Sequence, residues 1–233
     1  MPASFLDLPG EIRNEIYKYL LVHDGTIKPW RGDHALSPNI LATNKAILRE
    51  GRSILYGSNC FDFTLWNRNP SWIEVFFGTI GIINMGYFRS IRIGFPRPNW
   101  GRGPFTIHEV SLNNIIMIGG FCGRLESVTI TPISIFVLGN YLSGPPYPFE
   151  LYGPVLAQVD SHFRVIPTLK QITVEAPPCL GMNLRKMMEG FGWVIRNAAE
   201  HWYGYENDDP NADENIWCPI EDDELYEDSE MCC

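Results

Sequence analysis

Apolar positions near the start of the chain recur with the spacing of a helix. The segment from Leu8 to Leu21 places Ile12, Ile16 and Leu20 at every fourth position, and Leu8 precedes them by one turn. Polar residues occupy most of the positions between them. This pattern predicts an amphipathic helix that carries one apolar stripe.

A second segment with helical spacing is expected at residues 40–56, and the Gly-Ser-Asn sequence at 57–59 should end it. Between the two helices, residues 27–38 are polar and contain prolines and a glycine, which favours a loop. Residues 60–66 follow the second helix and alternate between apolar and polar side chains. This alternation predicts a half-buried strand.

Beyond residue 66, helix-like segments alternate with short apolar strands. Each strand has large apolar residues at its first, fourth and sixth positions, and the strands are residues 88–93, 125–130 and 169–174. The helix-like segments that precede them are residues 71–84, 107–121 and 154–166. Such alternation predicts a small, largely parallel sheet, joined by right-handed crossovers and covered by helices on at least one face.

Together these elements predict a mixed α/β (α+β) fold in which an N-terminal helical unit packs on an alternating body. The expected parts are a helical region at 1–65, an α/β body at 66–204 and an acidic, flexible tail at 205–233. The body should close with an amphipathic helix from Asn183 to Tyr203, although its two glycines each lower the helix propensity by about 1 kcal/mol.

The negative charge of the chain is concentrated at its end. The sequence holds 27 acidic and 18 basic residues, a formal net charge of −9. Twelve of the acids and none of the bases follow Tyr205, so the residues before that point are slightly basic. Because no run of lysine and arginine offers a footprint for phosphate groups, we expect no nucleic-acid partner. The acidic end is expected to be a solvated extension, with docking to a basic partner as the alternative.

The sequence indicates neither a membrane segment nor a catalytic centre. The start lacks the pattern of a secretory signal, and no apolar run reaches the roughly 18 residues of a spanning helix. We therefore expect a soluble protein of the cytoplasm or nucleus with no membrane partner. Phosphate-binding glycine loops, the G-x-S-x-G motif and paired metal ligands are absent, so we expect no cofactor, no metal and no enzymatic activity. A cysteine nucleophile stays open, because its histidine partner need only be near in space.

The two N-terminal helical segments carry a pair of motifs. The first, over residues 8–21, reads LPGEIRNEIYKYLL. The second joins LATNKAILRE at residues 41–50 to ILYGSNCFDF at residues 54–63. In this order the two motifs resemble the F-box-like segment of filamentous fungal proteins, and the resemblance covers about a quarter of the chain.

This resemblance implies a substrate adaptor of a cullin-type ubiquitin ligase. F-box helices dock on a Skp-type adaptor, while the rest of the chain holds an unidentified substrate protein. For the body of this chain we expect a small, leucine-rich-repeat-like sheet. An apolar stripe on a helix suits such docking. The residues expected to contact the adaptor are Leu8, Pro9, Ile12, Ile16, Tyr17 and Leu20.

The alternative is a self-contained structural or ligand-binding domain that has no ligase role. In that case the F-box-like motif is buried, because an amphipathic stripe commonly packs on the core of its own protein. Solvent exposure of Ile12, Ile16 and Leu20 would favour the adaptor.

Overall fold

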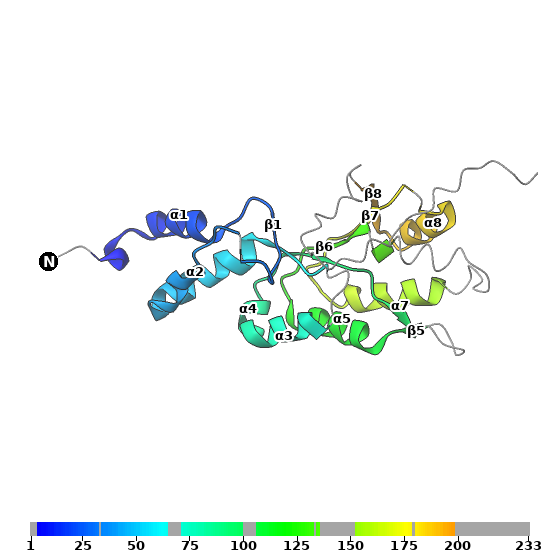
Figure 1. Ribbon diagram of the computed structural model, residues 1–233, viewed down its shortest axis with the longest axis horizontal. Coiled ribbons are helices and arrows are strands. Elements are labelled where there is room, and N and C mark those ends of the chain that lie inside the picture. The colour runs from blue at the N-terminus through cyan, green and yellow to red at the C-terminus, as the bar shows by residue number, and fades with distance from the viewer. Residues whose placement is uncertain are drawn as a thin grey trace, which may run out of the picture. The chain divides into compact units, whose positions relative to one another are not determined.

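The structure is a computed structural model that describes residues 4–32, 34–64, 71–99, 106–132, 134–135, 152–178 and 180–198. The described residues belong to one compact unit, which spans Met1–Ala199, and the predicted acidic tail lies outside the described residues. This unit has the mixed α/β fold that the sequence predicts (Figure 1). No helix in its described part is long and apolar enough to cross a bilayer.

Two α-helices begin the fold, and a short 3-10 helix precedes each of them. These four elements are η1 Phe5–Asp7, α1 Gly10–Leu21, η2 Pro38–Ala42 and α2 Lys45–Ser58. The side chain of Asn44 caps α2, because its oxygen accepts a 2.7 Å hydrogen bond from the backbone N–H of Ala46. Both predicted helices are therefore confirmed, and the second begins later than expected because its first turns are 3-10 helix.

The two helices pack through a small core of Tyr17, Leu21, Ile47 and Leu55. Gly51 allows the close approach, since a Cβ there would lie 2.5 Å from a methyl group of Leu41 and 3.2 Å from a methyl group of Leu21. The stripe predicted for α1 is only partly buried, because Ile12 is exposed and Ile16 and Leu20 are intermediate. The buried side of α1 is turned toward Tyr17 and Leu21, because those side chains meet α2.

A buried asparagine joins the ends of both helices to the sheet. Asn59 is 2% exposed, and its side-chain nitrogen donates 2.7 Å hydrogen bonds to the carbonyls of Leu21 and Leu55. Its side-chain oxygen accepts a 2.8 Å bond from the N–H of His23. One side chain thus satisfies the last carbonyl groups of α1 and α2, which helices otherwise leave unpaired.

The sheet has six parallel strands in the order β1-β2-β3-β6-β7-β8. They are β1 Thr26–Ile27, β2 Cys60–Asp62, β3 Ser90–Ile93, β6 Ser127–Ile130, β7 Gln171–Ala176 and β8 Val194–Asn197. A separate antiparallel pair consists of β4 Pro98–Asn99 and β5 Thr106–Ile107. The predicted parallel sheet is therefore confirmed.

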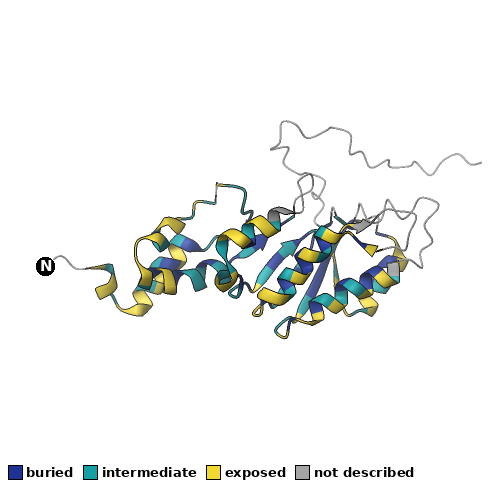
Figure 2. Ribbon diagram, turned by 90° about the horizontal axis from the view of Figure 1, so that it is seen from below, coloured by how far each residue is buried: buried dark blue, intermediate teal, exposed yellow. Residues whose placement is uncertain are grey.

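When neighbouring parallel strands follow the order of the sequence and every crossover is right-handed, the connecting helices all lie on one face of the sheet. In Figures 1 and 2 the helices that follow β2 are grouped in this way, whereas α2, which connects β1 to β2, lies beside α1. The helices of the body are α3 Ser71–Ile80, α4 Ile82–Met85, α5 Glu109–Phe121, α7 Tyr152–Arg164 and α8 Met182–Gly190. Between α3 and α4 the chain turns at Gly81, whose φ of 78° breaks the single helix predicted for residues 71–84.

The main core lies between the sheet and these helices. The apolar positions of the predicted strands point into it, and Phe88, Ile91, Leu125, Val128 and Val174 are almost fully buried. The alternate positions of the same strands are polar. One face of the sheet is therefore apolar and packed, and the other is polar.

Two further predictions about secondary structure are wrong. The closing helix expected over residues 183–203 ends at Gly190, and Val194–Asn197 forms β8 instead. Gly192 has a φ of 78°, which ends the helix and turns the chain back to pair with β7. The loop expected from residue 27 begins with a strand residue, because Ile27 pairs with Phe61 of β2.

Candidate functional site

The structure divides the six residues expected to contact a partner. Ile12 is 49% exposed and Pro9 is also exposed, whereas Tyr17 has no exposed surface. The remaining three are partly buried, namely Leu8, Ile16 and Leu20. The six side chains therefore do not form one continuous outward surface, and Tyr17 belongs to the core between α1 and α2.

A shallow groove of about 510 Å³ runs along the exposed side of the helix pair α1–α2. Its lining includes Ile12, Glu15 and Lys18 from α1 and Glu50, Ser53 and Ile54 from α2. Glu15 and Lys18 form an exposed ion pair at 2.7 Å. The groove combines apolar and charged side chains, and an amphipathic helix of a partner could lie in such a surface.

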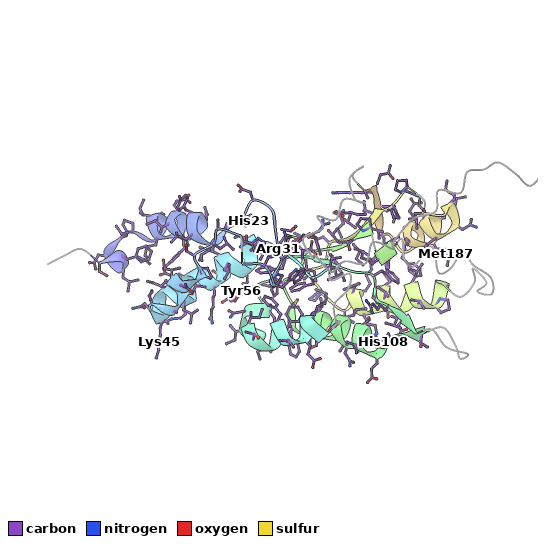
Figure 3. All side chains as sticks on the ribbon, in the orientation of Figure 1. His23, Arg31, Lys45, Tyr56, His108 and Met187 are labelled. Atoms are coloured by element: carbon purple, nitrogen blue, oxygen red, sulfur yellow. The ribbon has the colours of Figure 1, made fainter. Side chains whose placement is uncertain are left out.

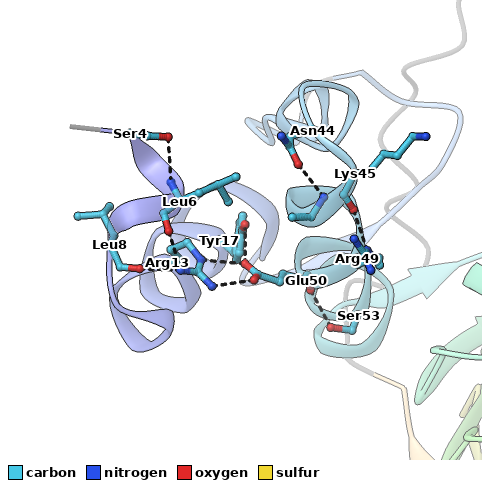
Figure 4. A network of polar contacts seen from close by, with 11 residues as sticks. Ser4, Leu6, Leu8, Arg13, Tyr17, Asn44, Lys45, Arg49, Glu50 and Ser53 are labelled. Atoms are coloured by element: carbon cyan, nitrogen blue, oxygen red, sulfur yellow. Dashed lines mark hydrogen bonds and ion pairs between the residues drawn. The ribbon is translucent and has the colours of Figure 1, made fainter. Parts of the chain in front are cut away.

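A polar cluster behind the groove fixes the two helices to each other (Figure 4). The Arg13 guanidinium donates two hydrogen bonds, of 2.9 and 2.7 Å, to the carboxylate of Glu50. The Tyr17 hydroxyl donates to the same carboxylate at 2.9 Å. Arg13 also donates to the carbonyl of Leu8 at 2.6 Å, which ties the turn before α1 to the cluster. Paired bonds of this kind, with charge on both partners, are the strong ones.

The pKa values of the cluster show that it does not switch near neutral pH. The hydrogen bonds from Arg13 are the largest cause that lowers the pKa of Glu50, and the Tyr17 hydroxyl adds to them. Burial and the neighbouring Glu50 carboxylate raise the pKa of Tyr17 to about 12. Glu50 therefore stays ionised and Tyr17 stays neutral, which is the arrangement of a structural clamp.

The polar face of the sheet is a second candidate surface. A row of small polar side chains crosses β2, β3 and β6, in which Ser127 donates to Ser90 at 3.0 Å and Ser90 donates to the Cys60 sulfur at 3.4 Å. In the parallel strands these three positions are register partners, so their side chains share one face. Such hydroxyl groups can accept and donate hydrogen bonds to a bound chain.

Arg92 is the central charged group of this polar face. Its guanidinium donates two 2.7 Å hydrogen bonds to the carboxylate of Glu175, which belongs to β7. The Arg92 Nε lies 3.6 Å from a carboxylate oxygen of Asp62, a distance at which the charges interact without a hydrogen bond. One arginine is thus shared between two carboxylates, so the cluster is slightly acidic.

Two small cavities lie near the carboxyl ends of β2 and β3. The larger, of about 170 Å³, is lined mainly by apolar side chains such as Trp30, Phe63 and Phe76. A neighbouring cavity of about 90 Å³ includes the buried polar residues Ser111 and Asn114. Among the described residues that line the larger cavity none is titratable, so they offer shape and apolar surface rather than acid–base chemistry.

The described thiols and metal-ligand residues do not form a reactive centre. Burial raises the pKa of Cys122 to about 12 and also raises the pKa of Cys60. Both thiols therefore stay protonated, and the thiolate is the form that attacks. Among the described residues, no group of three His, Cys, Asp or Glu side chains is placed to hold a metal ion.

Sequence reasoning missed the polar side chains that connect distant elements. Arg13 and Glu50 are 37 positions apart, and Asn59 is 38 positions from Leu21. Local sequence patterns place such residues only on a polar helix face or at a helix end. One signal was available for Asn59, because asparagine frequently ends helices and the Gly-Ser-Asn sequence at 57–59 follows the second helical segment.

Comparisons of the chain with protein-family models, with curated proteins and with solved structures find no match.

Proposed function

We propose that this chain is a non-enzymatic, intracellular protein-interaction module whose helix pair α1–α2 docks on the Skp-type adaptor of a cullin ubiquitin ligase. The observation that carries the proposal is the division of α1 into two sides. Tyr17 and Leu21 are fully buried and fix the helix, while Ile12 is 49% exposed beside the groove. Docking through Ile12 therefore needs no rearrangement of the core.

In this proposal the sheet holds the second partner, a substrate protein. Parallel sheets usually have both faces covered and apolar strands throughout. Here one face carries serine, threonine and glutamine side chains around Arg92 and Glu175. Polar residues at alternate strand positions support contact with water or with a polar protein surface.

The test is a pull-down of the purified chain with a fungal Skp-type adaptor, with Ile12→Asp as the variant. At a docked interface a carboxylate at this position would be desolvated and would have no ion-pair or hydrogen-bond partner. We therefore expect binding to weaken at least tenfold, a loss of about 1.4 kcal/mol in binding free energy. The matched control is Ile82→Asp on α4, because Ile82 is also an exposed isoleucine, with 64% of its surface accessible.

Circular dichroism of both variants must match that of the parent, since only folded variants report on binding. Binding by the parent and the Ile82→Asp protein, with loss in the Ile12→Asp protein, supports the adaptor role. An Ile12→Asp protein that binds as well as the parent contradicts docking through α1.

A second candidate function is a self-contained ligand-binding domain. The apolar cavity beside Trp30, Phe63 and Phe76 favours it, because ligand sites are typically apolar clefts with aromatic walls. Failure of the parent chain to bind any Skp-type adaptor would favour this candidate. A stabilising shift of the melting temperature by a small apolar compound, abolished in Phe76→Asp but not in Val165→Asp, would then support it.

A further inference from the structure

A row of basic side chains runs along α2 on a side that does not face α1. Lys45, Arg49 and Arg52 are separated by four and three positions, so they lie on one side of the helix. Figure 4 shows Lys45 and Arg49 directed away from α1, whereas Glu50 points toward it. In Figure 3, Lys45 lies at the end of α2 that is far from the sheet.

The row continues onto the turn before β3 through a tyrosine that is shared by two arginines. The guanidinium carbon of Arg52 lies 5.6 Å from the centre of the Tyr87 ring, and that of Arg124 lies 5.4 Å from it. The two cations are therefore at most about 11 Å apart, close to the screening length of about 8–10 Å at physiological salt, so their potentials add. We call Lys45, Arg49, Arg52 and Arg124 the basic ridge.

The charges of the ridge are not neutralised by the described carboxylates around them. Neither Arg52 nor Arg124 forms an ion pair within the part of the chain that the structure describes, and the Nε of Arg52 is buried without a hydrogen-bond partner. The acid on α2, Glu50, is already bound to Arg13. Glu126, two positions after Arg124, pairs with Lys170 at 2.5 Å and with Arg89 at 3.7 Å.

From these observations we infer that the basic ridge binds an acidic segment of a partner protein. Lys45 and Arg52 are about 10 Å apart along α2, and Arg124 lies within about 11 Å of Arg52, so the ridge spans at most about 21 Å. An extended acidic segment of about six residues has this length. Carboxylate side chains along it would meet the four cations of the ridge.

A nucleic acid is a poorer fit for the same ridge. Binding of single strands typically uses aromatic rings on which bases stack. Tyr87, the ring within the ridge, is already contacted by two guanidinium groups. The ridge therefore offers charge but no free stacking platform, which favours carboxylates.

The test measures fluorescence anisotropy of a labelled glutamate-rich peptide of about ten residues, longer than the ridge, with the full chain in about 100 mM salt. The variant is the double substitution Arg49→Gln and Arg124→Gln, since both side chains are exposed and their loss leaves the core intact. We expect the peptide to bind the parent and to bind this variant about tenfold more weakly.

The control is the double substitution Lys186→Gln and Arg196→Gln, which removes the same charge from exposed positions on α8 and β8. Binding within about twofold of the parent is expected for it. Three results would overturn the inference: no peptide binding by the parent, equal losses in both double variants, or tighter binding of a labelled oligothymidine that the ridge variant abolishes.

The ridge and the groove beside Ile12 use different sides of α2, so their tests are independent. The Ile12→Asp protein should bind the acidic peptide as the parent does. The Arg49→Gln and Arg124→Gln protein should keep any binding to the Skp-type adaptor. Failure of one proposal is thereby distinguished from failure of the other.

Discussion

Glu50 is a polar link between α1 and α2. Its carboxylate accepts hydrogen bonds from the Arg13 guanidinium and from the hydroxyl of the fully buried Tyr17. A buried hydroxyl that loses its acceptor carries a full desolvation cost. The charged side chain on the rim of the groove therefore has a structural role in the core beneath it.

Replacement of Glu50 by alanine should lower the free energy of unfolding by about 2 kcal/mol, because the Tyr17 hydroxyl is left buried without an acceptor. Urea denaturation followed by circular dichroism measures the change. Glu15→Ala is the control, since it removes only an exposed ion pair with Lys18 and should cost less than about 0.5 kcal/mol. Equal losses in the two variants would contradict the role assigned to Glu50.

The same carboxylate predicts a dependence of stability on pH. Its pKa is lower in the folded protein than in the unfolded chain, so its contribution is present above the unfolded pKa and is lost as the pH falls through the folded pKa. Between about pH 6 and pH 3, the melting temperature of the parent should fall toward that of a Glu50→Gln variant. A difference in melting temperature that stays constant across this range would argue against the ionised clamp.

At the scale of elements, apolar periodicity predicted most of the fold because it reports local geometry. The strands at 88–93, 125–130 and 169–174 are confirmed, since their apolar positions face one core. The buried side of α1 could not be predicted in the same way. It is set by the bond between Tyr17 and Glu50, 33 positions apart, which no local pattern contains.

The final helix was mispredicted for a related reason. Residues 194–197 have no strong strand pattern, and their strand forms because β7 presents an open edge to pair with. Prediction of the candidate site is limited in the same way, because local patterns do not contain the contacts between distant residues that bury a side chain. The sequence named Ile12 and Tyr17 together, whereas the structure exposes one and buries the other, and whether Ile12 contacts a partner stays a prediction.

Gly192 interrupts the helix predicted for residues 183–203, so that a turn and strand β8 follow α8. Its φ of 78° lies in the left-handed region, so Gly192→Ala should cost about 1–2 kcal/mol of stability. Gly190→Ala is the control, because Gly190 ends α8 without a positive φ and has open space around it. Thermal unfolding that shows the same loss for both alanine variants would contradict this assignment.

At the scale of the whole described fold, the central strands of the sheet differ from its two edge strands in hydrogen bonding. The central strands β3, β6 and β7 have a hydrogen-bonded neighbour on each side, whereas β1 and β8 have one each among the described strands. The central strands also carry the most deeply buried side chains. Local stability should therefore fall from the centre of the sheet to its edges.

Hydrogen exchange measured by mass spectrometry should reveal this gradient. Backbone amides of β6 should exchange slowest and those of β8 and β1 at least about tenfold faster, since edge strands open without global unfolding. Peptides from α5 and α7, which pack against each other and cover the sheet, serve as an internal reference for slow exchange. Exchange in β8 as slow as in β6 would contradict the gradient.

The agreement between chain order and strand order has a consequence for how the protein is made. Each strand of the sheet pairs with the strand that precedes it in the sheet and in the sequence. No strand therefore has to be inserted later between two strands that are already paired. Every step closes a loop of one crossover only, which keeps the entropic cost of each step small. As the chain leaves the ribosome, the sheet can grow strand by strand from β1 toward β8.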